Sequence, residues 1–190
     1  MVLVRPQRSA RRHRKVGNDL SYFGELTKAM TMLSEHGALF LGQSIVYDGQ
    51  RMHESFKDVP REQKIEMPII EEFQMGFCTG LSLTGHLPVC VYPRMDFLLL
   101  AANQLVNHLD KLPMFGWKPK VIIRVAVGSS EPFNPGPQHC QDHSEAFASM
   151  LKTVKVRLLH DAGMIISQYQ QALERPESTL LVEYASEYGK

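Results

Sequence analysis

The chain has 190 residues, of which 44% are hydrophobic, 22% charged and 8% aromatic, and its formal net charge is +1. This composition fits one globular domain with a sizeable core and excludes a wholly disordered chain. Apolar runs such as residues 97–102 are far too short to span a bilayer, so we expect no membrane protein. Three cysteines are too few for a disulfide scaffold and favour a reducing, cytoplasmic compartment.

Charge is unevenly distributed along the sequence. Six of the 21 Lys and Arg residues lie within residues 1–16, which contain no acid, so the rest has 15 basic against 20 acidic residues. We expect residues 1–17 to form a basic, disordered arm and residues 18–190 to form the folded domain. An Arg-rich, acid-free arm is also compatible with an organellar transit peptide. Binding to nucleic acid is disfavoured because the body lacks a basic stripe.

Hydrophobic periodicity and turn residues predict helices and strands that alternate along the chain. The predicted order is helix 21–36, strand 38–42, an irregular segment 43–67 with one helical turn at 52–56, helix 71–83, strand 88–93, helix 96–111 with Asp96 as its N-cap, strand 120–127, a helix from about residue 144, strand 154–159, helix 162–173 and strand 179–184.

The predicted strands are almost continuously apolar, which is typical of parallel strands covered on both faces. We therefore predict a single doubly wound α/β domain with a mostly parallel sheet and helices on both faces. Such sheets carry their chemistry at the carboxyl ends of the strands, here the loops at 42–49, 67–72, 92–97 and 127–143. No GxGxxG or GxxxxGK[ST] phosphate-binding motif is present.

Two of these loops carry candidate chemistry. The first leads from Pro68 into a helix with Glu71 and Glu72 in its first turn and with three glycines within ten residues, which suggests a close approach to the backbone. Ordinary helix capping explains the same glutamates. The second loop collects two histidines, a thiol and a carboxylate in residues 138–143. A zinc site on His139, Cys140 and His143 or a hydrolase site is compatible with this composition, but firm ligand spacing and a GxSxG motif are absent.

Several motifs together resemble the pyrimidine-binding domain of transketolase-like, thiamine-diphosphate enzymes. The likeness is strongest to the β subunit of the decarboxylating component of 2-oxoacid dehydrogenases and covers about residues 37–184. The matching pieces are Pro68–Glu71, Gly76, Gly80, Gly85–Pro88, Phe97, Gln104, Asn107, Val121–Arg124 and Gln138–His139.

The resemblance implies a role for three residues in particular. Glu71 corresponds to the glutamate that hydrogen-bonds a pyrimidine ring nitrogen and so promotes proton removal from the thiazolium carbon. Phe97 corresponds to the aromatic residue that stacks on the aminopyrimidine, although an ordinary core position explains it as well. His139 corresponds to a loop histidine that faces the substrate as proton donor or oxyanion partner.

Three further residues complete the expected site. Gly76 and Gln43 are assigned to the cofactor-binding surface, and Gln43 stands where the family usually has an acidic residue. Arg94 is expected either to bind a carboxylate or phosphate of the substrate or to pair with Asp96.

The resemblance also implies a partner. The chain has no Gly-Asp-Gly motif, so Mg²⁺ and the diphosphate are expected to be held by a larger α-type subunit and no metal ligand is assigned here. We expect a heterotetramer, a dimer of heterodimers, that is inactive without the partner. The family's β subunit continues into a second domain, whereas this sequence ends at Lys190, which predicts a stand-alone domain.

The expected reaction cleaves or forms a C–C bond next to the carbonyl of a 2-oxo acid, by decarboxylation and acyl transfer. Two alternatives stay open. One is transketolase-like transfer of two carbons from a ketose, and the other is a non-catalytic binding module that retains the fold.

Overall fold

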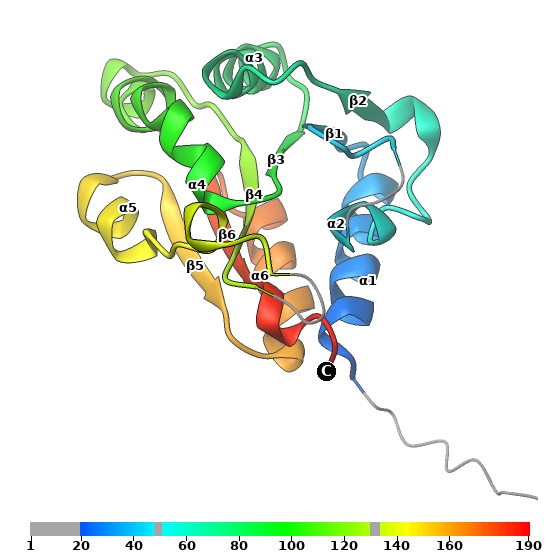
Figure 1. The fold of residues 1–190 in the computed structure, drawn as a ribbon. Coiled ribbons are helices and arrows are strands. Elements are labelled where there is room, and N and C mark those ends of the chain that lie inside the picture. The colour runs from blue at the N-terminus through cyan, green and yellow to red at the C-terminus, as the bar shows by residue number, and fades with distance from the viewer. Residues whose placement is uncertain (1–19, 48–50, 130–133) are drawn as a thin grey trace, which may run out of the picture.

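A six-stranded, all-parallel sheet forms the centre of the molecule (Figure 1). The computed structural model describes residues 20–47, 51–129 and 134–190, so the predicted basic arm lies outside the described residues. The strands follow the order β2-β1-β3-β4-β6-β5 across the sheet. Their bounds are β1 Leu39–Gly42, β2 Lys64–Glu66, β3 Pro88–Tyr92, β4 Ile122–Val127, β5 Lys155–Leu159 and β6 Thr179–Tyr184.

Helices cover both faces of this sheet, as Figure 1 shows. The helices are α1 Tyr22–Glu35, α2 Arg51–Glu54, α3 Glu71–Leu83, α4 Met95–Leu98, α5 Ser144–Met150 and α6 Ala162–Glu174. Helices α1 and α6 pack together over one face, and α3, α4 and α5 pack over the other. The predicted doubly wound α/β fold is therefore confirmed. Among the described residues, no helix has the length and apolar character needed to cross a membrane.

Alternating residues of each strand enter one of two hydrophobic cores. On β3, Val89 and Val91 face α1 and α6, whereas Cys90 and Tyr92 face α3 and α4. This alternation follows from the period of two along a strand and explains why both faces of the strands are apolar.

A charged network lies inside the α1–α6 core. The guanidinium of Arg124 on β4 pairs with the carboxylate of Glu183 on β6, and both side chains are fully buried. Tyr169 and Tyr188 donate to the two oxygens of Glu183 at 3.0 and 2.7 Å, and Arg124 donates to Ser55 Oγ at 2.7 Å. Every charged group thus has partners, which is the condition for burying an ion pair. The network fixes α6, the C-terminal segment and the turn after α2 to the sheet.

The sequence predictions differ from the structure at two elements. Residues 64–66 form the edge strand β2, although the segment 43–67 was predicted to be irregular. The predicted helix 96–111 begins at Met95 and contains a 3-10 turn and a π-helical stretch over Gln104–Leu109. Asp96 is not its N-cap, because Arg94 occupies that position and the Asp96 carboxylate accepts from Gln141 at 2.8 Å.

Candidate functional site

The candidate site lies where the carboxyl ends of β1, β3 and β4 meet the start of α3. Strands β1 and β3 are paired neighbours, so the loops that follow them emerge side by side. The structure brings the expected residues together as two pairs, Gln43 with Glu71 and Phe97 with His139. This is the edge at which an open α/β sheet binds its ligands.

Glu71 begins helix α3, and its side chain is held in place at several points. The residue is only 6% exposed, and its Oε1 accepts from Gln43 Nε2 at 3.1 Å. The hydroxyl of Tyr92 donates to the Glu71 backbone carbonyl at 2.8 Å. Burial raises the pKa of Tyr92 far above its usual value, so this donor stays protonated. The first turn of a helix also favours a carboxylate through the helix dipole.

The loop that carries Gln43 is fixed by Glu66, at the end of β2. The Glu66 carboxylate accepts from the backbone N–H groups of Ser44, Ile45 and Val46 at 2.5, 3.1 and 3.1 Å. Ser44 adopts a left-handed conformation, with φ of 57°, which turns these three N–H groups toward one acceptor. Our sequence reasoning missed Glu66, because only the pairing of β2 with β1 brings it to the loop.

Close packing holds the start of this loop as well. A Cβ atom on Gly42 would lie 2.5 Å from the backbone oxygen of Val91 on β3. Only glycine fits at this distance, so β1 and β3 approach each other closely directly before Gln43. Gln43 therefore leaves the sheet from a fixed point.

Phe97 and His139 form the second pair. Both are half-buried, and their rings meet edge to face with centroids 5.5 Å apart. Phe97 comes from α4, after β3, whereas His139 comes from the 3-10 turn Pro137–His139 in the long loop after β4. An aromatic ring beside an imidazole provides a stacking surface next to a proton donor or acceptor.

Arg94 and Asp96 connect the segment after β3 to the long loop after β4. Arg94 NH1 donates to the backbone oxygen of Gly128 at 2.7 Å, and Asp96 Oδ1 accepts from Gln141. Within the described part of the chain, two buried polar atoms here have no hydrogen-bond partner, Oδ2 of Asp96 and Nε2 of His143.

The described residues contain no group of three His, Cys, Asp or Glu that could hold a metal, so the alternative zinc set around His139 does not form.

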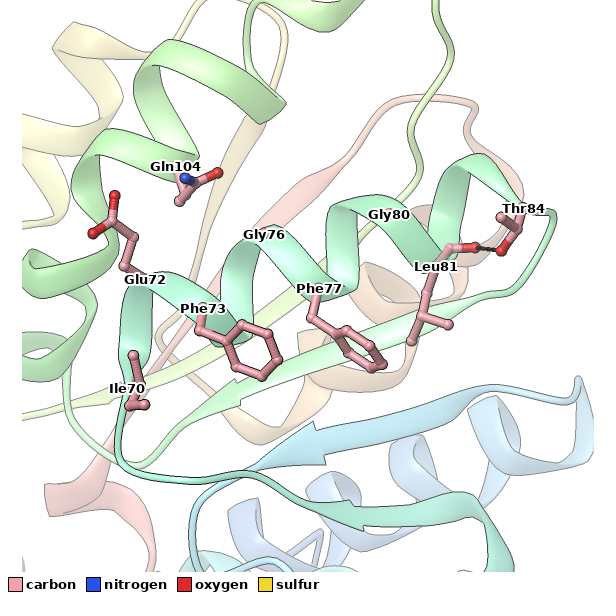
Figure 2. Close-up of a pocket in the computed structure, with 9 residues that line it drawn as sticks. All are labelled: Ile70, Glu72, Phe73, Gly76, Phe77, Gly80, Leu81, Thr84 and Gln104. Atoms are coloured by element: carbon pink, nitrogen blue, oxygen red, sulfur yellow. Dashed lines mark hydrogen bonds between the residues drawn. The ribbon is translucent and has the colours of Figure 1, made fainter.

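Gly76 lies apart from these residues. It follows Glu71 by five residues. At 100° per residue, Gly76 therefore lies about 140° around the helix axis from Glu71. A Cβ atom at Gly76 would meet Gln104 Oε1 at 3.4 Å, on the outer side of α3. Gly76 therefore lines a different surface, a groove drawn in Figure 2.

Comparison with known proteins agrees with this architecture. No family model matches the sequence. The β subunit of the pyruvate dehydrogenase E1 component from Chaetosphaeridium globosum is 26% identical over 132 residues, which is 65% of this chain and 38% of that protein. A split-gene transketolase, solved as an inactive β4 tetramer, superposes with a TM-score of 0.67 at 20% identity, over 86% of this chain and 51% of that one. The fold is that of a transketolase-like pyrimidine-binding domain.

A transketolase from Campylobacter jejuni gives a similar result, with a TM-score of 0.69 and 16% identity over 87% of this chain. The chain spans only 26% of that transketolase, and about two fifths and one half of the other two relatives. A domain of this fold thus accounts for only part of each relative.

Proposed function

We propose that this chain is the pyrimidine-binding, β-type subunit of a two-component thiamine-diphosphate-dependent enzyme. The observation that carries the proposal is the environment of Glu71. Its carboxyl group lies at a helix N-terminus, almost fully buried, with one oxygen oriented by Gln43. This is the group that a protein needs to exchange a proton with a ring nitrogen of the cofactor.

The residues of the site fit the aminopyrimidine end of thiamine diphosphate. Glu71 Oε2 makes no hydrogen bond to the described residues and is available to a ring nitrogen. Phe97 is half-buried and would stack against the ring. When bound, thiamine diphosphate supplies a nucleophilic carbon for addition to the substrate carbonyl. Glu71 would hold and return the proton of the ring nitrogen, and His139 would donate a proton or a hydrogen bond to the substrate.

We propose that the diphosphate and Mg²⁺ are held by a larger α-type subunit and that the two subunits form a heterotetramer. The absence of Gly-Asp-Gly from the 190 residues supports this division. So does the description of one structural relative as a split-gene transketolase. The chain would be inactive without that subunit.

For the substrate we propose a 2-oxo acid, with decarboxylation and acyl transfer, because the curated relative is the β subunit of a pyruvate dehydrogenase component. Arg94 would bind the substrate carboxylate from the loop that it ties to Gly128. Two-carbon transfer from a ketose is the second candidate, and it is supported by the likeness to two transketolases.

The test compares two neighbouring glutamates. The full chain is co-purified with a tagged partner that carries Gly-Asp-Gly, and consumption of 2-oxo acids and of ketoses is measured with thiamine diphosphate and Mg²⁺. Glu71→Gln should lower turnover at least about 100-fold, because it removes a general acid–base group. Glu72→Gln is the matched control. The Glu72 side chain is exposed and accepts a hydrogen bond from Asn103, so the turnover of the Glu72→Gln variant should stay within about twofold of the wild type.

Either of two results would contradict the proposal. If Glu71→Gln retains full turnover in the complex, Glu71 has no role in proton exchange. If the purified complex turns over neither substrate class and does not bind thiamine diphosphate, the chain is a binding module that retains the fold.

A further inference from the structure

The segment directly after β3 contacts the long loop after β4 at several points. Four consecutive residues, Arg94–Phe97, each contact one residue of that loop, and α4 lies beside the 3-10 turn Pro137–His139 (Figure 1). The contacts are hydrogen bonds from Arg94 Nη1 to the Gly128 oxygen at 2.7 Å, from the His143 backbone N–H to Met95 Sδ at 3.0 Å and from Gln141 Nε2 to Asp96 Oδ1 at 2.8 Å, and the ring contact of Phe97 with His139. A single short stretch of chain thus holds the loop that carries His139.

The turn that carries His139 has little support of its own. It is only three residues long, and Gly136 at its N-cap position has no side chain that could cap it. The His139 N–H donates to the Gly136 oxygen at 3.1 Å. Hydrogen bonds in 3-10 turns have poorer geometry than those in α-helices, which is one reason why such turns stay short. The position of His139 therefore depends on contacts outside its own turn.

The bond between Gln141 and Asp96 is the strongest of these contacts close to His139. Gln141 follows His139 by two residues, and its amide donates to a carboxylate oxygen. A hydrogen bond to an ionised acceptor is about twice as strong as one between neutral groups. The bond from the His143 N–H to Met95 uses a thioether sulfur, which is a weak acceptor. Gln141 and Asp96 thus do most to restrict the turn.

Asp96 is itself fixed to the hydrophobic core. Its neighbours in α4, Met95 and Leu98, are fully buried in the core that α4 shares with β3 and β4. The Asp96 side chain is half-buried, and its second oxygen, Oδ2, has no hydrogen-bond partner among the described residues. The carboxylate therefore acts on the loop through Gln141.

We propose that Asp96 is a positioning residue for His139. The Asp96 carboxylate holds Gln141, and Gln141 holds the turn so that the imidazole stays edge-on to Phe97. The inference rests on the proposed function, in which His139 donates a proton or a hydrogen bond to the substrate. A group in that role must be held within about 0.5 Å of its working geometry. A displacement of about 1 Å can lower the rate about 100-fold.

A direct effect of the Asp96 charge on His139 would give a different pattern among three variants. Asp96→Asn keeps an oxygen that accepts from the Gln141 amide but has no charge. Gln141→Ala keeps the charge and loses the hydrogen bond, and Asp96→Ala loses both. If Asp96 positions His139 through Gln141, the two alanine variants resemble each other and the asparagine variant resembles the wild type.

The first measurement is turnover by the full chain in complex with the tagged partner that carries Gly-Asp-Gly. Asp96→Ala and Gln141→Ala should each lower kcat about 10- to 100-fold and leave KM within about threefold, because the bond positions His139 rather than the substrate. The double variant should lose no more than the worse single variant, because both break one contact. Asp96→Asn should keep kcat within about threefold. The matched control is Glu145→Ala, which removes an exposed carboxylate four residues after Gln141 and should match the wild type.

The second measurement needs neither the cofactor nor the partner. NMR of the full chain alone, with labelled His and Phe side chains, should show cross-relaxation between the ring protons of His139 and Phe97. This signal should persist in Asp96→Asn and Glu145→Ala and be lost in Asp96→Ala and Gln141→Ala. The thermal midpoint of each variant should stay within about 3 °C of the wild type, because the bond lies at the surface.

Three results would overturn the proposal. The first is a kcat that falls in Asp96→Asn but not in Gln141→Ala, which would indicate a direct effect of charge. The second is a contact between His139 and Phe97 that survives both alanine variants. The third is a contact that is lost while kcat stays unchanged. A complex in which even the wild type has no turnover would contradict the proposed function alone, and the NMR signal would then decide whether Asp96 positions His139.

Discussion

Asp110 links the end of the π-helical segment to the start of β5, and its substitution should have a large, pH-dependent effect. The side chain is fully buried. Its Oδ1 accepts from the backbone N–H groups of Lys152, Thr153 and Val154 at 2.9, 2.7 and 3.0 Å, and Oδ2 pairs with Lys111 at 2.8 Å. Asp110→Asn removes the charge that these donors surround.

The magnitude follows from the pKa of Asp110. Burial by itself would raise this pKa, but the Lys111 ammonium and the three backbone donors outweigh it and lower the pKa from 3.8 to about 2. At 1.36 kcal/mol per unit, the ionised carboxylate contributes about 2.5 kcal/mol to the free energy of unfolding. Because the folded pKa is the lower one, this contribution is complete above about pH 5 and declines as the pH falls. About half of it remains at pH 3.

The assay is urea unfolding of the full chain at pH 7 and at pH 3. Asp110→Asn should lower the free energy of unfolding by about 2 to 3 kcal/mol at pH 7, and the deficit should be roughly half as large at pH 3. Asp58→Asn, which changes an exposed carboxylate, should shift the free energy by less than about 0.5 kcal/mol at either pH. An equal deficit at both pH values would refute the reasoning, because the loss would then come from packing rather than from charge.

Two further substitutions test the contacts that hold the backbone on either side of Gln43, namely the close packing of Gly42 and the hydrogen bonds to Glu66. Gly42→Ala should lower the free energy of unfolding by about 2 to 3 kcal/mol in urea, because the new methyl group meets the Val91 backbone oxygen and neither strand can move aside. An unchanged midpoint would contradict that close approach. Glu66→Gln removes the charge from an acceptor of three backbone N–H groups and should speed amide hydrogen exchange at Ile45 and Val46 at least tenfold. Unchanged exchange rates would show that Glu66 does not hold the loop.

The strands that the sequence predicted are those with continuous apolar runs. Residues 120–127 and 179–184 supply β4 and β6, which lie in the middle of the sheet and are buried on both faces. Strand β2 has the opposite character, since Lys64–Glu66 contains one apolar residue between two charged ones. Charged, short edge strands are common because they discourage pairing with other chains. Only the hydrogen bonds to β1 make this segment a strand, and no local pattern reveals them.

The helix after β3 shows a similar limit. Asp96 has the residue type of an N-cap, and the apolar pattern after it is helical. In the structure Asp96 lies inside the first turn and accepts from Gln141, which is 45 residues later in the sequence. A long-range partner thus takes the carboxylate that a local rule assigns to the cap. Gln141 belongs to the loop that brings His139 to Phe97. The hydrogen bond between Gln141 and Asp96, which keeps Asp96 from capping the helix, therefore also helps to shape the site.

The contact between Gln43 and Glu71 gives a physical reason for the departure from the family pattern at position 43. Two carboxyl groups at the 3.1 Å that separates these side chains would repel each other or share one proton. An amide donates its N–H instead, which orients Oε1 without binding a proton. The glutamine therefore removes proton sharing between positions 43 and 71 and leaves Oε2 of Glu71 available to the proposed cofactor. The backbone of Gln43 is in turn set by Gly42 and by the Glu66 carboxylate, so the orientation of Glu71 depends on two residues that the sequence resemblance did not single out.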